Sequence, residues 1–212
     1  MMANDKCCLC DKESSNEYFP KIKVTEINCK NCGRYKISER VKRIINSKYS
    51  GKSHLFSGYF RELKEIGRKP EKVTEDNIDT ILSNTIIPET ALEKLDKLLL
   101  YFDRNTEFIY QKVSIKKDDT AISYSKNKEE LKNMLEALEN QEYISKEGEW
   151  GWKNGEKVKY KLTLDGISEI NKIKEKQIEN TKQAFVAMWF GDQMMEVYDK
   201  YSRTNSAKKT TL

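Results

Sequence analysis

Cys7-Cys8-Leu9-Cys10 and Cys29-Lys30-Asn31-Cys32-Gly33 are the two stretches of sequence that decide the fold of the N-terminal region. Each contains two cysteines with two residues between them, and eighteen residues separate the two pairs. This spacing allows a tight turn to direct both sulfur atoms at one ion, and Gly33 can adopt the positive φ that ends such a turn. Two such turns supply the four ligands of a closed tetrahedral site. We therefore predict a structural zinc site built from Cys7, Cys10, Cys29 and Cys32.

Zinc binding would explain how this small region folds, because a module of about 50 residues buries little apolar surface without a metal. We assign residues 1–50 to a zinc ribbon. Cys8 is the fifth cysteine, and it is either a free thiol or a competitor of Cys7 for the metal. Iron bound by the same four ligands and a set of thiols without metal are the alternatives to zinc.

The chain after the second cysteine pair is strongly basic. Seven Lys and Arg residues lie between Lys30 and Lys48, against one acid. Four thiolates and Zn²⁺ together carry a net charge of about −2, so part of this positive charge balances the metal site itself. Ser38 is expected to cap a helix over residues 39–47 that carries several of the basic side chains. The alternative to phosphate contact is a solvated helix face without a ligand. The candidates for phosphate contact are Arg34, Arg40, Lys42 and Arg43.

Residues 51–105 are expected to form helices, because apolar residues recur there at helical spacing. The apolar stripes are typical of core packing, and we predict no chemistry in this segment. Gly51-Lys52-Ser53 resembles the end of a phosphate-binding loop, but Asn46 stands where the first glycine of that motif is needed. His54 is the single histidine, and we expect it to be a packing or surface residue rather than a general base.

Residues 106–180 have the order of elements found in a winged-helix domain, with Asn127 expected to cap the helix before the hairpin. That helix enters the major groove in many winged-helix proteins, yet residues 126–140 contain three lysines and four glutamates. The hairpin over residues 146–161 has five lysines and three glutamates. Its candidates for nucleic-acid contact are Lys157 and Lys159. A protein–protein or homodimer interface is an equal alternative for this domain.

Ala184-Phe185-Val186-Ala187-Met188-Trp189-Phe190 is an unbroken run of seven apolar residues. Such a run is typical of a strand buried in a parallel sheet, or it docks as an extra segment on the preceding domain. Ligands of α/β domains lie at the carboxyl ends of the strands, so Gly191 and Asp192 are candidates for nucleotide binding. The 22 residues after Phe190 are too few for another crossover unit. We therefore expect an α/β domain that is truncated just after its first strand.

The overall composition fits a globular protein, with 10% aromatic and 34% charged residues. The net charge of +5 permits nucleic-acid contact without requiring it. Asp5 and the first cysteines occupy the place where a signal peptide would need an apolar segment, and no run approaches the roughly 20 apolar residues of a membrane span. We expect a cytoplasmic protein without membrane contact, in which cysteines are metal ligands or free thiols.

Three stretches together give this chain a family resemblance. They are Cys29 to Tyr35 with the preceding cysteine pair, Leu162-Thr163-Leu164-Asp165-Gly166, and Gln183 to Phe190, while Leu55 to Glu62 is a weaker echo. With these parts in order, the chain resembles a bacterial family with an N-terminal zinc ribbon and a helical and winged-helix middle. The last domain of that family is TIR-like or similar to nucleoside 2-deoxyribosyltransferases. The resemblance implies a role in sensing or cleaving nucleosides or nucleotides, often in phage defence.

The resemblance does not imply that this chain is an enzyme. The later segment of the family that bears the carboxylate for glycosidic-bond chemistry is missing here. Asp192 and Glu196 lie beside the expected strand, but two carboxylates at the edge of an unfinished sheet do not form a pocket for base and sugar. We therefore assign no catalytic residues.

The sequence as a whole predicts an α+β chain of four parts. They are a zinc ribbon (1–50), a helical segment (51–105), a winged-helix-like domain (106–180) and the truncated start of an α/β domain with a disordered tail (181–212). Our favoured interpretation is a zinc-stabilised sensor or binding module, the front end of a nucleotide- or nucleoside-processing defence effector. One alternative is a fragment of a deoxyribosyltransferase-like or TIR-like hydrolase that needs a missing half, and another is a protein–protein scaffold. The expected partners are nucleic acid, another protein, or a second copy bound through the winged helix.

Overall fold

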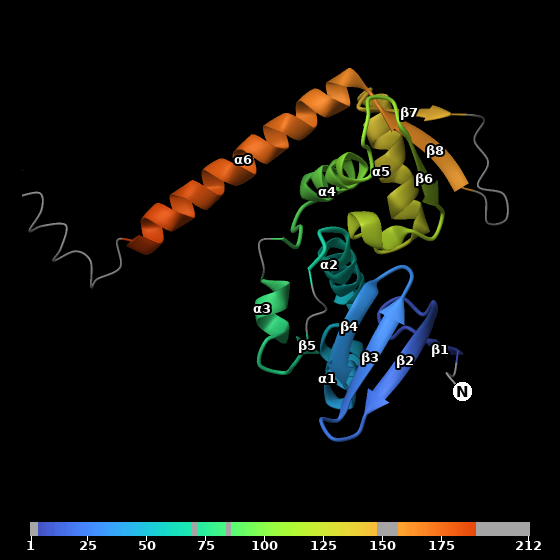
Figure 1. Ribbon diagram of the computed structural model, residues 1–212, viewed down its shortest axis with the longest axis vertical. Helices are drawn as coiled ribbons and strands as arrows, with labels where there is room; N and C mark the ends of the chain where they lie inside the picture. Colours follow the sequence, from blue (N-terminus) through green and yellow to red (C-terminus); the bar gives the residue numbers. More distant parts are fainter. Residues whose placement is uncertain (1–3, 69–71, 84–85, 148–156, 190–212) are drawn as a thin grey trace, which may run out of the picture. The chain divides into compact units, whose positions relative to one another are not determined.

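The computed structural model describes the backbone of residues 4–68, 72–83, 86–147 and 157–189, without the side chains of 4–5 and 180–189 (Figure 1). The chain divides into two compact units, Met1–Ile170 and Asn171–Leu212. Among the described residues there are six α-helices and two β-sheets. The expected α+β class is therefore confirmed.

The first sheet has five strands in the order β1-β2-β3-β4-β5, and its loops carry the cysteine pairs. The strands are β1 (Asn4–Lys6), β2 (Glu13–Phe19), β3 (Val24–Cys29), β4 (Gly33–Ser38) and β5 (Lys72–Val73). β1 to β4 pair in antiparallel fashion, whereas β5 pairs with β4 in parallel. The turn from β3 to β4 ends at Gly33, whose φ is +89°. A side chain at Gly33 would also come within 3.0 Å of the Phe60 carbonyl oxygen, so the predicted need for glycine is confirmed.

Four helical segments follow this sheet or interrupt it. They are α1 (Glu39–Lys48), the 3₁₀ helix η1 (Ser50–Lys52), α2 (Ser53–Glu65) and α3 (Ile78–Leu82). Ser38 caps α1 as predicted, because its side-chain oxygen accepts a hydrogen bond from the Val41 backbone N–H. The rings of Tyr35 on β4 and Phe60 on α2 stack with their centroids 4.7 Å apart. Both rings are fully buried, so α2 covers the end of the sheet that carries the cysteines.

The second sheet has three antiparallel strands in the order β6-β8-β7, with helices on one side. Its elements are α4 (Ala91–Arg104), β6 (Lys112–Lys116), η2 (Thr120–Ser123), α5 (Lys128–Asn140), β7 (Ile144–Glu147) and β8 (Lys157–Leu162). Every second residue of β6 and β8 is buried, and the Tyr160 ring meets the Phe102 ring of α4 at 6.2 Å. Asn127 caps α5 through a 2.9 Å hydrogen bond from the Glu130 backbone N–H, as predicted.

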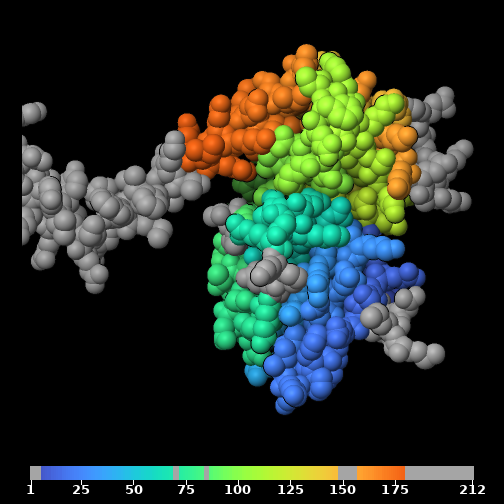
Figure 2. Space-filling model, viewed as in Figure 1, coloured from blue at the N-terminus to red at the C-terminus, as the bar shows by residue number. Residues whose placement is uncertain are grey.

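Helix α2 packs against both β4 and η2, and it lies between the first sheet and the segment that follows β6 (Figure 2). Tyr124, which ends η2, is almost fully buried against Gly58 of α2. Its hydroxyl donates a 2.6 Å hydrogen bond to Glu62, and Lys97 of α4 lies 3.0 Å from the same carboxylate. The Glu62 side chain is only 12% exposed, so it needs these partners to offset its lost hydration.

Helix α6 (Leu164–Trp189) begins in the first unit and supplies residues 171–189 to the second. The Thr163 hydroxyl caps it by accepting a 3.0 Å hydrogen bond from the Gly166 N–H. The predicted buried strand over residues 184–190 is wrong at 184–189, because these residues continue the helix. A strand needs a hydrogen-bonded neighbour, and no described strand pairs with this segment, whereas a helix satisfies its own backbone groups. Phe190 and the rest of the expected α/β start lie outside the described residues.

The close approach of Tyr124 to α2 predicts that Gly58→Ala destabilises the protein. A Cβ at this position would lie 2.4 Å from a Tyr124 ring carbon, and this overlap outweighs the intrinsic helix preference of alanine. We expect a loss of about 1–3 kcal/mol in the free energy of unfolding, measured by denaturant titration of the metal-loaded protein. Gly51→Ala is the matched control, because a Cβ there meets nothing within 4 Å. Equal stability of the two variants would contradict the packing of Tyr124.

Candidate metal centre

The four predicted cysteine ligands lie together. The sulfur atoms of Cys7, Cys10, Cys29 and Cys32 are all within 4.8 Å of one another. Cys7 and Cys32 are separated by 3.7 Å between their sulfur atoms, and Cys10 and Cys29 by 3.6 Å. A zinc–sulfur bond of about 2.3 Å in tetrahedral geometry places sulfur atoms about 3.8 Å apart. The cluster could therefore hold one metal ion, and its ligands and spacing are compatible with zinc.

Backbone hydrogen bonds shape the first cysteine turn. The Cys7 N–H donates to the Lys12 carbonyl at 2.8 Å, and the Asp11 N–H donates to the Cys7 carbonyl at 2.9 Å. Asp11 takes a φ of 55°, which reverses the chain after Cys10. The second turn joins the end of β3 to the start of β4. Each pair of ligands is thus fixed by a tight loop at one end of the same sheet.

Side-chain hydroxyl groups of the surrounding core contact the buried sulfur atoms. Tyr35 Oη lies 3.1 Å from Cys7 Sγ, and Ser57 Oγ lies 3.0 Å from Cys32 Sγ. Burial and the neighbouring Cys7 raise the pKa of Tyr35, so its hydroxyl keeps its proton. Asn31 adds an Nδ2 contact to the Cys32 sulfur at 3.8 Å. These donors stabilise thiolate charge at the two ligands on the core side.

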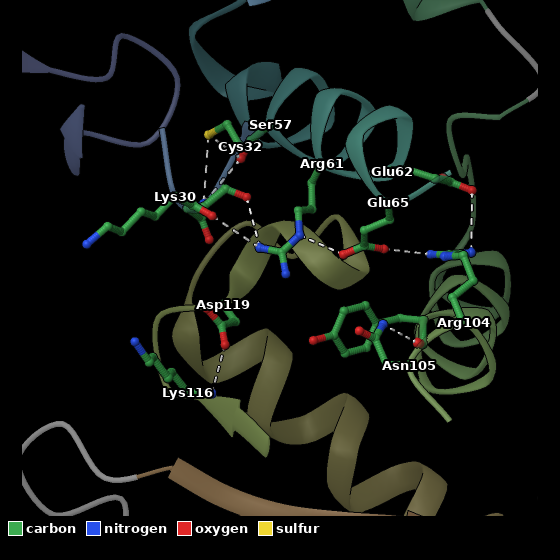
Figure 3. Close-up of polar contacts among 12 residues, drawn as sticks. Lys30, Cys32, Ser57, Arg61, Glu62, Glu65, Arg104, Asn105, Lys116 and Asp119 are labelled. Carbon is green, nitrogen blue, oxygen red and sulfur yellow. Dashed lines mark hydrogen bonds and ion pairs between the residues drawn. The ribbon is translucent and has the colours of Figure 1, made fainter. Parts of the chain in front are cut away.

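An ion-pair chain connects the second cysteine turn to the rest of the first unit (Figure 3). Arg61 Nη1 donates to the carbonyl oxygens of Asn31 at 3.2 Å and Lys30 at 3.5 Å. Arg61 Nε lies 2.6 Å from Glu65, and Glu65 accepts a 3.0 Å contact from Arg104 of α4. The side chains of Arg61, Glu65 and Arg104 are each at most 21% exposed. The orientation of the cysteine turn therefore depends on charges carried by α2 and α4.

The thiols influence one another's pKa values because the sulfur atoms share hydrogen bonds. Contacts with Cys10 and Cys29 raise the pKa of Cys7, and contacts with Cys10 and Cys29 also raise the pKa of Cys32. The pKa of Cys29 is lowered by hydrogen bonds from Cys10 and Cys32. Some sulfur atoms thus keep protons when no cation neutralises the cluster. A divalent cation would displace those protons, so metal binding weakens as the pH falls.

Cys8 lies outside the four-cysteine cluster. Its sulfur atom is 3.4 Å from Tyr35 Oη, and burial raises the pKa of its thiol. The described residues contain no disulfide, and all five cysteines are free. Of the two roles predicted for Cys8, the geometry favours the free thiol.

The basic candidates of the first sheet and α1 lie among acids. Arg34 pairs with Glu26, Arg40 Nε lies 2.7 Å from Glu75, and Lys42 Nζ lies 2.6 Å from Glu39. Arg40 and Arg43 line an open groove of about 570 Å³ together with acidic side chains. These pairs reduce the local excess of positive charge. Phosphate contact by the four residues stays a prediction.

Lys157 and Lys159 lie on a different surface, the exposed face of β8. The six residues predicted for nucleic-acid contact are therefore not brought together into one site. The predicted nucleotide-binding residues Gly191 and Asp192, with Glu196, lie outside the described residues. Sequence reasoning missed Ser57 and Arg61 beside the metal centre. The stretch Leu55–Glu62 was considered only as a weak part of the family resemblance, although it contains both of these residues.

His54 lies partly buried at the start of α2, as a packing residue would. Burial, followed by the positive charge of Lys94, lowers its pKa to about 4. The partial burial agrees with a packing role, and the expectation that His54 is not a general base stays a prediction.

Comparisons of this chain with protein-family models, curated proteins and solved structures found no match. The described part of the chain also contains no helix that is both long and apolar enough to cross a membrane.

The geometry of the cluster predicts that the protein carries metal and that Cys10→Ser removes it. We expect wild-type protein to contain about one zinc ion per chain by elemental analysis, and Cys10→Ser to contain far less. Cys8→Ser is the matched control, since Cys8 is equally part-buried but outside the cluster, and it should keep its metal. Loss of metal from Cys8→Ser with retention in Cys10→Ser would show that the ligand set is wrong.

The environment of His54 predicts an unusual titration. At about pH 5.5 a solvated imidazole is mostly protonated, whereas His54 should stay neutral because its pKa is near 4. The protein has one histidine, so the Hε1 signal of its ring can be assigned in proton NMR without ambiguity and the midpoint can be measured directly. Lys94→Gln removes a repelling charge and leaves Glu130 nearby, so the pKa should rise in this variant. A midpoint near 6.5 in the wild type would contradict the burial of this ring.

Proposed function

We propose that this chain is a zinc-stabilised binding module without catalytic activity of its own. The observation that carries the proposal is the closed set of four cysteine sulfur atoms. Four protein ligands fill a tetrahedral zinc site, which leaves no position for a substrate or an activated water. Zinc in such a site stabilises the fold. The cysteine turns with β1 to β4 then form a zinc ribbon whose role is to hold α2 in place.

We further propose that the segment from α4 to the start of α6 is a winged helix. The element order of helix, strand, short helix, helix, hairpin and helix supports this assignment. So does the strand order β6-β8-β7, in which the first strand pairs with the returning strand of the hairpin. Winged helices bind either nucleic acid or protein, and the charges of the individual surfaces have to decide between them.

Helix α5, which would enter the major groove in many winged helices, is poorly suited to that role. Lys128 Nζ pairs with Asp118 at 2.5 Å, and Lys132 Nζ lies 3.7 Å from Glu136. The helix carries four glutamates and two lysines. A groove-reading helix that repels phosphate would lose most of the electrostatic part of binding. The basic residues elsewhere on the first unit are better candidates for contact with nucleic acid.

We therefore favour nucleic acid as the partner and sensing as the role. From the family resemblance we propose that the module is the front part of a nucleotide- or nucleoside-processing defence effector in the cytoplasm. The enzyme-fragment alternative and the α/β start of the resembled family both expected a strand at 184–190, and the structure has a helix at 184–189 instead. The scaffold alternative keeps one favourable observation, which is a group of exposed apolar side chains before β6.

Nucleic-acid binding should be detectable and strongly salt-dependent. We expect the metal-loaded protein to bind labelled oligonucleotides of about 20 nucleotides with micromolar affinity in fluorescence anisotropy. Raising the salt from about 50 to 200 mM should weaken binding about 10-fold or more, because several lysines release counterions from phosphate. Single-stranded DNA, RNA and duplex DNA are compared in the same titration. Absence of binding to all three, together with a stable dimer in sedimentation, would favour the scaffold instead.

A further inference from the structure

The exposed face of the β6-β8-β7 sheet is covered by lysines. Residues 112, 114 and 116 of β6 point to solvent, and 157 and 159 of β8 are also exposed. The register pairs Lys112 with Lys161 and Lys116 with Lys157, so these lysines lie directly opposite one another on adjacent strands. We define the lysine face as Lys112, Lys116, Lys157, Lys159 and Lys161.

The lysine face carries a large excess of positive charge. Its acidic neighbour is Glu147 of β7, which lies opposite Lys159 and pairs with Lys112 at 2.6 Å. A hydrogen bond from Lys112 and the charges of Lys112, Lys159 and Lys161 lower the pKa of Glu147, which places these lysines around it. Within the described residues, the other four lysines have no ion pair. Among the residues that the structure describes on this face, the Glu147 carboxylate stands against five ammonium groups.

Such an arrangement costs stability in the isolated protein. Like charges directly opposite on neighbouring strands are destabilising, and two such pairs occur here. The basic residues of β4 and α1 are arranged in the opposite way, because Arg34, Arg40 and Lys42 each have an acid beside them. The unneutralised charge is thus concentrated on one sheet face, which suits a polyanionic ligand.

Exposed aromatic side chains adjoin this face. Phe108, Ile109 and Tyr110 precede β6 and are 65%, 59% and 50% exposed. Their turn is held by Gln111, whose Oε1 accepts hydrogen bonds from the backbone N–H groups of Glu107 and, at 3.3 Å, Phe108. Lys161 Nζ lies 5.6 Å from the centroid of the Tyr110 ring, so the turn and the lysine face form one continuous surface.

We infer that this surface binds single-stranded nucleic acid, with the lysines on the phosphates and the Phe108 and Tyr110 rings stacked on bases. Basic surfaces next to aromatic rings are the common design of single-strand binders, because every base offers a face for stacking. A duplex hides its base faces, and a flat sheet face does not enter the major groove as a helix does. β8 spans about 20 Å, enough for a short single-stranded segment of about four nucleotides.

This inference rests on the proposed nucleic-acid function and assigns it a surface and a strand type. It differs from the sequence prediction in two respects. Lys157 and Lys159 now act with three lysines from the same sheet face, and the basic residues of α1 are not part of the site. The exposed apolar turn, which favoured a protein scaffold, becomes the stacking element of the same surface.

The test compares two triple variants with the same change in net charge. Lys116→Gln with Lys157→Gln and Lys159→Gln should weaken binding of labelled oligothymidine about 10-fold or more and lower the salt slope by about 2. Arg40→Gln with Lys42→Gln and Arg43→Gln, on α1, should change the affinity less than about twofold. Metal content and thermal midpoint of both variants establish that each is folded.

Stacking is tested separately. Phe108→Leu keeps an apolar side chain but removes the aromatic ring, so affinity for oligothymidine should fall about 5-fold or more while the salt slope stays the same. Phe108 is 65% exposed and leucine keeps an apolar side chain there, so the variant should keep the wild-type thermal midpoint.

Three results would overturn the inference. The first is tighter binding to a duplex of the same sequence than to the single strand, together with no effect of the lysine-face variant. The protein would then bind nucleic acid through another surface. Competition by polyglutamate as strong as that by oligothymidine, with no effect of Phe108→Leu, would assign the surface to acidic peptides. Absence of binding to every nucleic acid would remove the proposed function itself.

Discussion

Four sulfur atoms within 4.8 Å of one another cannot all carry negative charge unless a cation lies among them. A cation held among the sulfur atoms would also tie the two cysteine turns together, and this would order the N-terminal region. Ser57 and Arg61 of α2 then recognise the second turn through its sulfur and carbonyl groups. The same helix packs against Tyr124 at Gly58. Helix α2 therefore contacts both the cysteine turn and the residues that pack on the second sheet.

The parts of this fold that the sequence predicts well are those encoded by local chemistry. The cysteine spacing is one example, since two residues between ligands have few ways to reach one ion. The caps at Ser38 and Asn127 are others, because each needs only its own side chain and a backbone N–H three residues later. Such signals depend on neighbours in the chain. These local structures therefore form whatever the fold of the rest of the molecule is.

The failures came where the answer depends on distant partners. The apolar run at 184–190 has the composition of a buried strand, but a strand exists only if another strand pairs with it. The lysine face was missed for a related reason. Charge was counted along the hairpin, where three glutamates offset part of the charge of five lysines, whereas β6 contributes Lys112 and Lys116 from a different part of the chain. The alternation of lysine with apolar residues in β6 and β8 was the signal available in the sequence.

Helix α2 also determines which pieces of this protein can be exchanged or expressed alone. A cut after residue 50 would separate Cys32 from Ser57 and Tyr35 from Phe60, and would expose the aromatic stack to water. The cysteine-bearing sheet therefore does not fold as an independent unit without α2, although segments with this cysteine spacing often do. Recombination that preserved both sheets but replaced α2 would have to restore a glycine, a hydroxyl, an arginine and a carboxylate on one helix at matching positions. Because the first sheet and the second sheet both depend on α2, we expect the two parts of the first unit to be inherited together.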